Sequence, residues 1–275
     1  MELTLGPVLF EWKRDELVRF YDEVAGMDVD TVYLGEVVCT RKLALSFDDV
    51  GRIAEKLEGS GKKVVLSSLA VVSNEDELEF TRRLAAFPYA IEANDMSVLN
   101  IVDPSKREVR AGPHITSYNA PSIEFLKEVG IRHVTFPVEL PRESVLYNIR
   151  HTGIEGEVFV HGKVPLAFSW RCYTSRAFGL GKTDCRHHCA GFPDGMEIKT
   201  MDSEPLFTIN GTTLLSASTY TLIESVEDLK DIGVKAIRVS PQYRGTGKVV
   251  ELFRKRIKGE LEAAEGLDEI KGFTA

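Results

Sequence analysis

Short runs of apolar and β-branched residues alternate along the chain with segments in which apolar residues recur every three or four positions. Such runs are typical of strands buried on both faces, and the three- and four-residue spacing is typical of amphipathic helices. Most runs begin about 20 to 30 residues after the one before, which is the length of a strand–helix unit. The predicted strands lie at residues 3–10, 30–37, 62–69, 89–94, 109–114, 132–140, 156–162 and 234–240.

Helices are predicted between the strands, at residues 47–61, 74–87, 120–130, 224–233 and 249–266. Glycines stand directly before several strands, at Gly26, Gly61, Gly130 and Gly233. A left-handed residue that ends a helix is least strained when it has no Cβ, so these glycines indicate helix ends. Alternating strands and helices with short links indicate a parallel sheet. Eight repeats favour a TIM-like (β/α)8 barrel, with a doubly wound open sheet as the alternative.

The repeat is interrupted between the seventh and eighth predicted strands, from about residue 165 to 223. This segment is rich in cysteine and glycine, and its second half alternates like a small hairpin around Asn210 and Gly211. We interpret it as an insertion in a single barrel domain that spans residues 1–275. An insertion that follows a barrel strand lies at the C-terminal face, where ligands and catalytic groups gather.

Charge and composition narrow the classes of partner and the compartment. The formal charge of -8 and the pI near 5.4 argue against nucleic acid or an acidic membrane as partner. The basic run at 254–258 is interpreted as a solvated helix face. No segment approaches the roughly 20 apolar residues of a membrane span, and the N-terminus does not resemble a signal peptide. We therefore expect a cytoplasmic protein, whose thiols stay reduced.

The four cysteines are Cys39, Cys172, Cys185 and Cys189. Cys185 and Cys189 are four residues apart, a spacing that would place them on one helix face, and Cys39 follows the second strand on the face that the insertion should cover. Each cysteine alone could be a small buried hydrophobe, but the later three lie in a glycine-, basic- and histidine-rich loop, which favours a metal or cluster. Four thiolates serve zinc and iron–sulfur clusters alike. Zinc sites usually have two tight pairs and only one is present, so the spacing favours a 4Fe-4S cluster.

Residues 157–172, EVFVHGKVPLAFSWRC, resemble the signature of the U32 peptidase family. The matching positions are Glu157, Phe159, His161, Gly162, Ser169 and Cys172. The family's usual cysteine after His-Gly is absent, and Pro165 stands in its place. The arrangement of one early cysteine and a later trio with twelve and three intervening residues is similar to that of the short UbiV-like branch of the family.

This resemblance implies a TIM-like barrel that holds a 4Fe-4S cluster on Cys39, Cys172, Cys185 and Cys189. It also implies a heterodimer with a UbiU-like U32 protein. The implied activity is oxygen-independent hydroxylation of a small aromatic or prenylated substrate, as in anaerobic ubiquinone biosynthesis. Two alternatives remain open. One is a U32-type peptidase, although no HExxH motif or convincing Ser-His-Asp set is present. The other is a non-catalytic scaffold that a metal stabilises and that positions a partner enzyme.

Polar residues at the C-terminal ends of the predicted strands are candidates for the site, because these ends surround the mouth of a barrel. Glu36 and His161 are the predicted catalytic residues, since each could take or give a proton. The predicted substrate-binding residues are Asn94, His114, Asn119, Tyr243 and Arg244, and Glu139 and Ser240 occupy equivalent positions. His187 and His188 are interpreted as groups around the cluster or as solvated side chains rather than as ligands.

Overall fold

Eight parallel strands close into a barrel in the computed structural model, which describes residues 1–42 and 44–273. Each strand pairs with the next, and the last pairs with both the first and the seventh. The strands are β1 (Glu2–Leu5), β2 (Thr31–Gly35), β3 (Lys63–Ser67), β4 (Ala90–Ala93), β5 (Val109–Ala111), β6 (His133–Thr135), β7 (Glu155–Phe168) and β11 (Ala236–Val239). All eight predicted strands and the TIM-like (β/α)8 barrel are confirmed.

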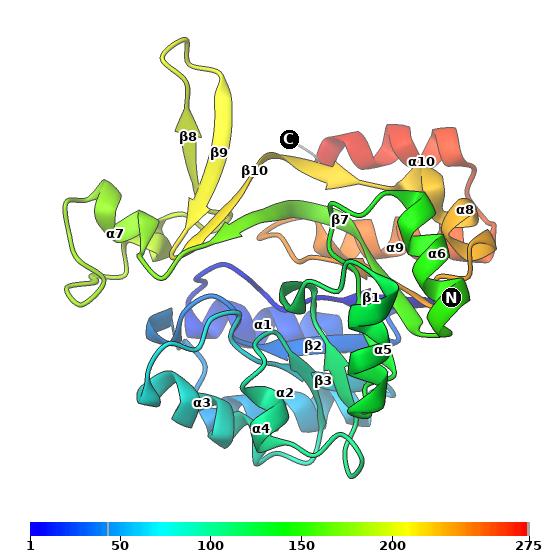
Figure 1. Ribbon diagram of the computed structural model, residues 1–275. Coiled ribbons are helices and arrows are strands. Elements are labelled where there is room, and N and C mark those ends of the chain that lie inside the picture. The colour runs from blue at the N-terminus through cyan, green and yellow to red at the C-terminus, as the bar shows by residue number, and fades with distance from the viewer. Residues whose placement is uncertain (43, 274–275) are drawn as a thin grey trace.

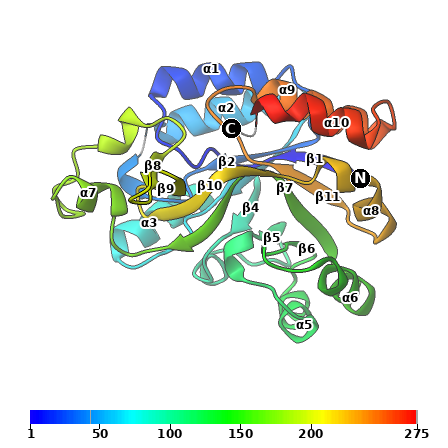
Figure 2. The same cartoon turned by 90° about the horizontal axis from the view of Figure 1, so that it is seen from above.

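Helices surround the strands, as the view from above shows, with α1, α2, α9 and α10 on one side and α5 and α6 on the other (Figure 2). Their bounds are α1 (Arg14–Val24), α2 (Phe47–Gly59), α3 (Glu75–Ala85), α4 (Val98–Ile101), α5 (Ala120–Glu128), α6 (Arg142–Thr152), α8 (Val226–Asp231), α9 (Thr246–Lys258) and α10 (Ala263–Ile270). Thr4 contacts Glu157 inside the barrel, so its neighbours Leu3 and Leu5 point outward. Both are fully buried, and the main apolar core therefore lies between the barrel wall and the helices.

Glycines end several helices. Gly61, Gly130 and Gly233 have φ angles of 85°, 104° and 91°, as the sequence predicted, whereas Gly26 is not among the residues with positive φ. The predicted helix at 249–266 is two helices, because Gly259 has a φ of 73° and ends α9 before α10 begins. None of the helices in the described ranges is long and apolar enough to cross a lipid bilayer.

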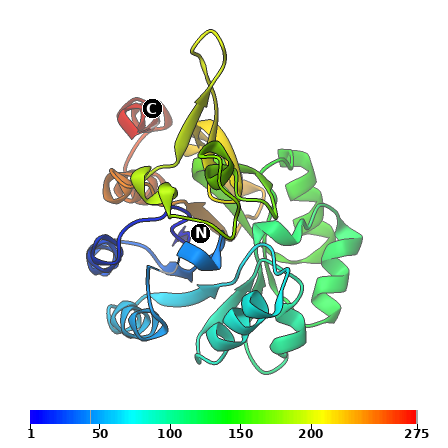
Figure 3. The same ribbon diagram turned by 90° about the vertical axis from the view of Figure 1, so that its left-hand side faces the viewer.

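Between β7 and β11 the chain forms a small antiparallel sheet beside the mouth of the barrel. The segment between β7 and β11 contains α7 (Tyr173–Ala177), β8 (Met196–Lys199), β9 (Pro205–Asn210) and β10 (Thr213–Thr221). The second half of β7 leaves the barrel and pairs with β10, and β9 and β10 form the predicted hairpin at Asn210 and Gly211. The β8–β9 hairpin projects away from the barrel (Figures 1 and 3). Its tip is solvated, with Met201 fully exposed.

Candidate functional site

A network of polar side chains fills the barrel interior around Glu157 of β7, which is completely buried. Its carboxylate accepts hydrogen bonds from the hydroxyls of Thr4, Tyr33 and Thr135 and from the Arg238 guanidinium, and it contacts His133 Nε2 at 2.8 Å. Burial alone would raise the pKa of Glu157. The charge of Arg238 and the His133 contact outweigh burial and hold that pKa well below its usual range. Glu157 is therefore an ionised anchor of the network.

Arg238 of β11 joins two buried carboxylates. Its Nη1 donates to Glu92 at 2.7 Å and its Nη2 to Glu157 at 2.9 Å, while its guanidinium lies 3.8 Å from the centroid of the Tyr33 ring. Arg110 supplies a second positive charge and donates to the Tyr33 hydroxyl at 3.1 Å. Two arginines thus face two carboxylates, and the interior is close to neutral. The charge of Arg238 is already paired with two buried carboxylates, so it is not a free receptor for an anion.

A small cavity of about 30 Å³ lies above this network, and we call it the mouth cavity. The polar residues that line it are Glu92, Asn94, His114, Arg238 and Ser240, and apolar neighbours include Leu9, Val37 and Phe159. The structure therefore brings Asn94, His114 and Ser240 together, three of the residues that the sequence placed at strand ends. Asn94 Nδ2 donates to Glu92 at 3.0 Å and to the Ser68 carbonyl at 3.1 Å.

A wider hollow of about 330 Å³ adjoins the cavity, and we call it the mouth groove. His114, Pro113 and Pro165 line both spaces, while Tyr118, Glu139 and Phe168 line the groove alone. The His114 ring meets Phe168 edge to face with 4.3 Å between the ring centroids. Burial lowers the pKa of His114 to about 4, so its ring is neutral at physiological pH. The groove thus offers aromatic, apolar and neutral polar surface.

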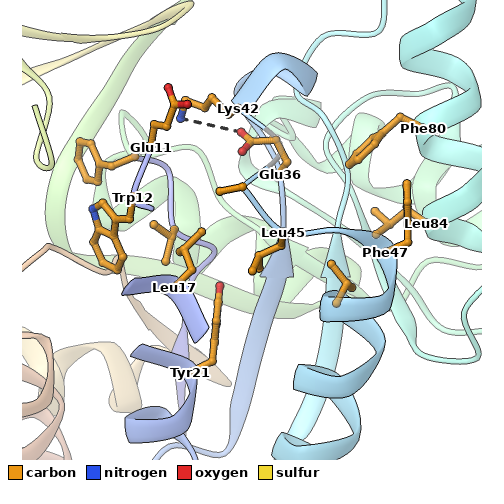
Figure 4. A pocket seen from close by; sticks show the side chains of 15 residues that line it. Glu11, Trp12, Leu17, Tyr21, Glu36, Lys42, Leu45, Phe47, Phe80 and Leu84 are labelled. Atoms are coloured by element: carbon orange, nitrogen blue, oxygen red, sulfur yellow. Dashed lines mark ion pairs between the residues drawn. The ribbon is translucent and has the colours of Figure 1, made fainter. Parts of the chain in front are cut away.

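Glu36 lies in a different pocket, which side chains of α1, α2 and α3 help to line (Figure 4). Leu17, Tyr21 and Phe80 form part of its apolar wall, and Glu11, Glu36 and Lys42 stand at its polar end. The Glu36 carboxylate accepts the backbone N–H groups of Val38 at 2.8 Å and Cys39 at 3.1 Å, and Lys42 Nζ lies 4.0 Å away. Burial raises the pKa of Glu36. Its visible role is to hold the turn that carries Cys39.

Cys189 and His187 both contact Glu11. The Cys189 thiol donates to Glu11 Oε2 at 2.5 Å, and His187 Nδ1 lies 2.8 Å from Glu11 Oε1. The His187 backbone N–H donates to Cys185 Sγ at 3.4 Å. Burial, followed by the bond to Glu11, raises the pKa of Cys189. These contacts bring Cys189 to Glu11, at the polar end of the pocket that Glu36 also lines, and Cys185 lies near enough to Cys189 for its charge to act on that thiol.

Cys39 and Cys172 are tied to one turn, the tip of the β9–β10 hairpin. Thr212 Oγ1 donates to the Val38 carbonyl at 2.9 Å, next to Cys39, and Gly211 O accepts the Tyr173 N–H at 2.7 Å, next to Cys172. The Lys42 charge acts on both Cys39 and Cys189 and opposes the rise in pKa that burial causes. Lys42 therefore lies near both Cys39 and Cys189.

All four cysteines are free thiols, and Cys172 and Cys189 are buried. Their number and chemistry fit a thiolate-bound iron–sulfur cluster or zinc, and their segments meet at one face of the barrel. Within residues 1–42 and 44–273, however, no three His, Cys, Asp or Glu side chains are grouped as a ready metal site. The donor set thus fits such a group, and its ligation stays a prediction.

The other predicted residues have contacts away from the mouth cavity. His161 is buried against Phe253 of α9, with 6.1 Å between the ring centroids, and burial lowers its pKa to about 4. Asn119 caps α5 by accepting the Ser122 N–H at 3.0 Å. Tyr243 donates its hydroxyl to Glu16 at 2.8 Å, and Arg244 follows it in the exposed turn before α9. Their predicted roles remain predictions.

Sequence reasoning assigned no role to the charged residues of the barrel interior. Glu92, Arg110 and Arg238 each stand in the middle of an otherwise apolar strand, with apolar neighbours on both sides. Because successive side chains of a strand point to opposite faces, one charge in such a run must point into the barrel. That alternation was the available signal, and the opposite signs of the charges indicated that they pair.

Solved structures that match this chain include N-acetylneuraminate lyase from Fusobacterium nucleatum, with 10% identity and a TM-score of 0.49, covering 97% of this chain and 78% of that one. Phospho-2-dehydro-3-deoxyheptonate aldolase from Thermotoga maritima has 12% identity and a TM-score of 0.49, covering 94% of this chain and 68% of that one.

A curated relative is the 23S rRNA 5-hydroxycytidine C2501 synthase of Escherichia coli strain K12, which is 23% identical over 225 residues. The match covers 78% of this chain and 33% of the relative, so the chain spans about a third of the relative's length. The family model described as peptidase family U32 matches residues 20–270. Since this match covers most of the sequence, the chain belongs to peptidase family U32.

Proposed function

We propose that this chain is the iron–sulfur subunit of an enzyme that hydroxylates an aromatic ring with an oxygen donor other than O2. The observation that carries the proposal is that all four cysteines of the chain, separated by up to 150 positions in sequence, belong to segments that meet at one end of the barrel. The relative named as a 5-hydroxycytidine synthase supports the reaction class, because its product carries a hydroxyl group on an aromatic base.

Cys39, Cys172, Cys185 and Cys189 would hold a 4Fe-4S cluster, which supplies electron transfer when bound. Two neighbouring residues, Glu36 and Lys42, act on these cysteines. Glu36 fixes the backbone at Cys39 through two N–H bonds. Burial raises the pKa of Cys39 and of Cys189, and the Lys42 charge opposes this rise and so acts in favour of the thiolates, the forms that bind metal.

The finer part of the proposal concerns partner and substrate. The chain spans a third of its curated relative, and we propose that a UbiU-like U32 chain completes the enzyme as a heterodimer in the cytoplasm. The substrate is a small aromatic or prenylated ring, as in anaerobic ubiquinone biosynthesis. The apolar and aromatic walls of the mouth groove support a ring as the bound group.

Anaerobic purification with iron and sulfide analysis tests the cofactor. We expect about four of each per chain and a brown protein whose absorbance near roughly 400 nm fades in air, since these are properties of a 4Fe-4S centre. Cys39→Ala and Cys185→Ala should lower the iron content, whereas Met201→Ala at the exposed hairpin tip should not. Stoichiometric zinc, or full iron in Cys39→Ala, would contradict the proposed cluster.

Turnover tests the reaction class. The chain and a U32 partner, mixed without O2 and supplied with an organic oxygen-atom donor that is reduced as it gives up its oxygen, should hydroxylate a phenolic ring, with the product detected by a mass increase of one oxygen atom. The chain alone should leave the ring unchanged. Cleavage of unfolded protein substrates by the metal-free chain would favour the U32-type peptidase instead, and iron binding without any turnover would favour the non-catalytic scaffold.

A further inference from the structure

Asn94 holds an unused acceptor at the floor of the mouth cavity. Its side chain is 2% exposed, and among the residues that the structure describes its Oδ1 has no hydrogen-bond partner. The orientation of the amide is fixed, because Nδ2 donates to two acceptors, Glu92 and the Ser68 carbonyl. Exchanging the two amide atoms would place an oxygen against both acceptors. A buried amide oxygen without a donor is costly, which indicates a ligand that donates a hydrogen bond there.

Gly112 provides the space that this oxygen occupies. Its φ of -76° is accessible to any residue, so conformational freedom does not require a glycine here. A Cβ at this position would overlap Asn94 Oδ1 and crowd Glu92. The lack of a side chain at Gly112 therefore allows the Asn94 oxygen to lie against the backbone at this position.

The sizes of the two spaces define how a ligand would lie. The mouth cavity, at about 30 Å³, has room for roughly two water molecules and so admits only the edge of a ring. The mouth groove, at about 330 Å³, can hold the body of the ring against His114 and Phe168. Because His114 lines both spaces, a planar ligand can extend from the groove into the cavity.

The charge of the lining limits the ligand further. The mouth groove contains no lysine or arginine among its lining residues, and Glu139 is its charged member. Arg238 in the mouth cavity is neutralised by Glu92 and Glu157. A nucleic-acid strand needs Lys and Arg contacts to its phosphates, and this surface does not offer them.

From these observations we infer that the mouth binds a small, uncharged planar ring whose edge carries an O–H or N–H group, and that Asn94 Oδ1 accepts this group. The inference rests on the proposed function for the choice of an aromatic substrate and names its class. It differs from the substrate in the relative's name, which is ribosomal RNA.

Binding without turnover tests the inference. Phenol and anisole have the same ring, but only phenol donates a hydrogen bond, so their dissociation constants for the full chain can be compared by ligand-detected NMR. We expect phenol to bind about three- to tenfold more tightly, the range of one neutral hydrogen bond. Cytidine and a short RNA that contains cytidine form the second pair of probes. The RNA should bind no more tightly than the free nucleoside.

Two variants locate the acceptor. Asn94→Ala removes the oxygen, and Gly112→Ala displaces it while leaving Asn94 in the chain. Both should abolish the preference for phenol and leave anisole binding within about twofold. Asn100→Ala, an exposed asparagine on α4, is the matched control and should keep the preference. Circular dichroism checks that each variant is folded. If Asn94→Ala does not fold, Gly112→Ala still tests the acceptor.

The outcomes separate this inference from the proposed function. Equal binding of phenol and anisole, no binding of any ring, or a preference that survives in both variants would overturn the role of Asn94. Tighter binding of the RNA than of cytidine would overturn the small-ring substrate. A protein that lacks iron and turnover but keeps the Asn94-dependent preference would refute the hydroxylase and retain the binding site.

Discussion

Glu157 shows at the level of one residue how this barrel differs from an apolar one. The interior of a typical TIM barrel is filled mainly by branched apolar side chains. Here the centre is an ionised carboxylate that meets hydroxyl, imidazole and guanidinium groups from four other strands. Such a network is stable only when each member is satisfied, so the loss of one member leaves several buried donors unpaired.

Glu157→Gln should therefore destabilise the protein strongly. The substitution removes a buried negative charge but leaves Arg238, so we expect the free energy of unfolding to fall by about 3–5 kcal/mol. Urea denaturation at pH 7 measures the change. Glu128→Gln, an exposed glutamate at the end of α5, is the control and should change stability by less than about 0.5 kcal/mol. Similar changes in the free energy of unfolding for the two variants would show that the Glu157 charge does not stabilise the fold.

Because His161 is buried, we expect the stability of the protein to depend on pH. Burial holds its pKa at about 4 in the folded protein, against 6.5 for an unperturbed histidine. Between pH 6.5 and 4 the unfolded chain therefore binds a proton that the folded chain does not, and the free energy of unfolding falls as the pH falls. The full effect is about 3 kcal/mol.

Urea denaturation of the wild type and His161→Gln at pH 7 and pH 4 isolates this contribution. The variant should lose less stability on acidification than the wild type, although His114 keeps part of the dependence in both. Asn100→Ala removes no titrating group and should follow the wild type. A variant that loses as much stability as the wild type would refute the assignment.

At the scale of elements, the tip of the β9–β10 hairpin connects the segments that carry the cysteines. Besides the bonds of Gly211 and Thr212, Asn210 Nδ2 donates to the Leu9 carbonyl at 2.6 Å, close to Glu11. One turn thus contacts the loop after β1, the turn at Cys39 and the start of α7. Its backbone conformation depends on Gly211, whose φ is 61°.

Gly211→Ala should destabilise the protein by about 1–2 kcal/mol, because a residue with Cβ is strained in the left-handed region. Thermal or urea denaturation measures this effect. The control is Gly59→Ala at the end of α2, where a Cβ meets nothing within 4 Å and helix propensity predicts a gain of up to about 1 kcal/mol. The two glycines should therefore respond with opposite signs, and the same sign for both would contradict the strain argument.

The elements were predictable where hydrophobic periodicity was strong, and the contacts of the site were not. The barrel strands and the β9–β10 hairpin followed from runs of apolar residues and the Asn210–Gly211 pair. The separation of α9 from α10 was missed because Gly259 lies within a continuous apolar pattern. The outward turn of His161 toward Phe253 depends on an irregularity in the pairing of β7 with β11, which periodicity does not encode.

At the scale of the whole molecule, the barrel and the projecting β8–β9 hairpin are distinct parts (Figures 1 and 3). Residues 201–206 at its tip are all exposed. Replacing residues 200–204 by Asn-Gly, which favours a two-residue hairpin turn, should change the free energy of unfolding by less than about 0.5 kcal/mol. Urea denaturation of the shortened chain provides the measurement, and Gly211→Ala in the same assay shows the response of the packed turn. A loss above about 2 kcal/mol would mean that the tip supports the barrel.

The seam that closes the barrel joins strands from opposite ends of the described chain, since β1 at residues 2–5 pairs with β11 at residues 236–239. During translation the first strand is synthesised long before β11, so the backbone N–H and C=O groups on that edge of β1 have no partner until β11 exists. Contacts between such distant positions form slowly because a large loop must close first. We therefore expect the barrel to close late in folding and to present an open sheet edge until then.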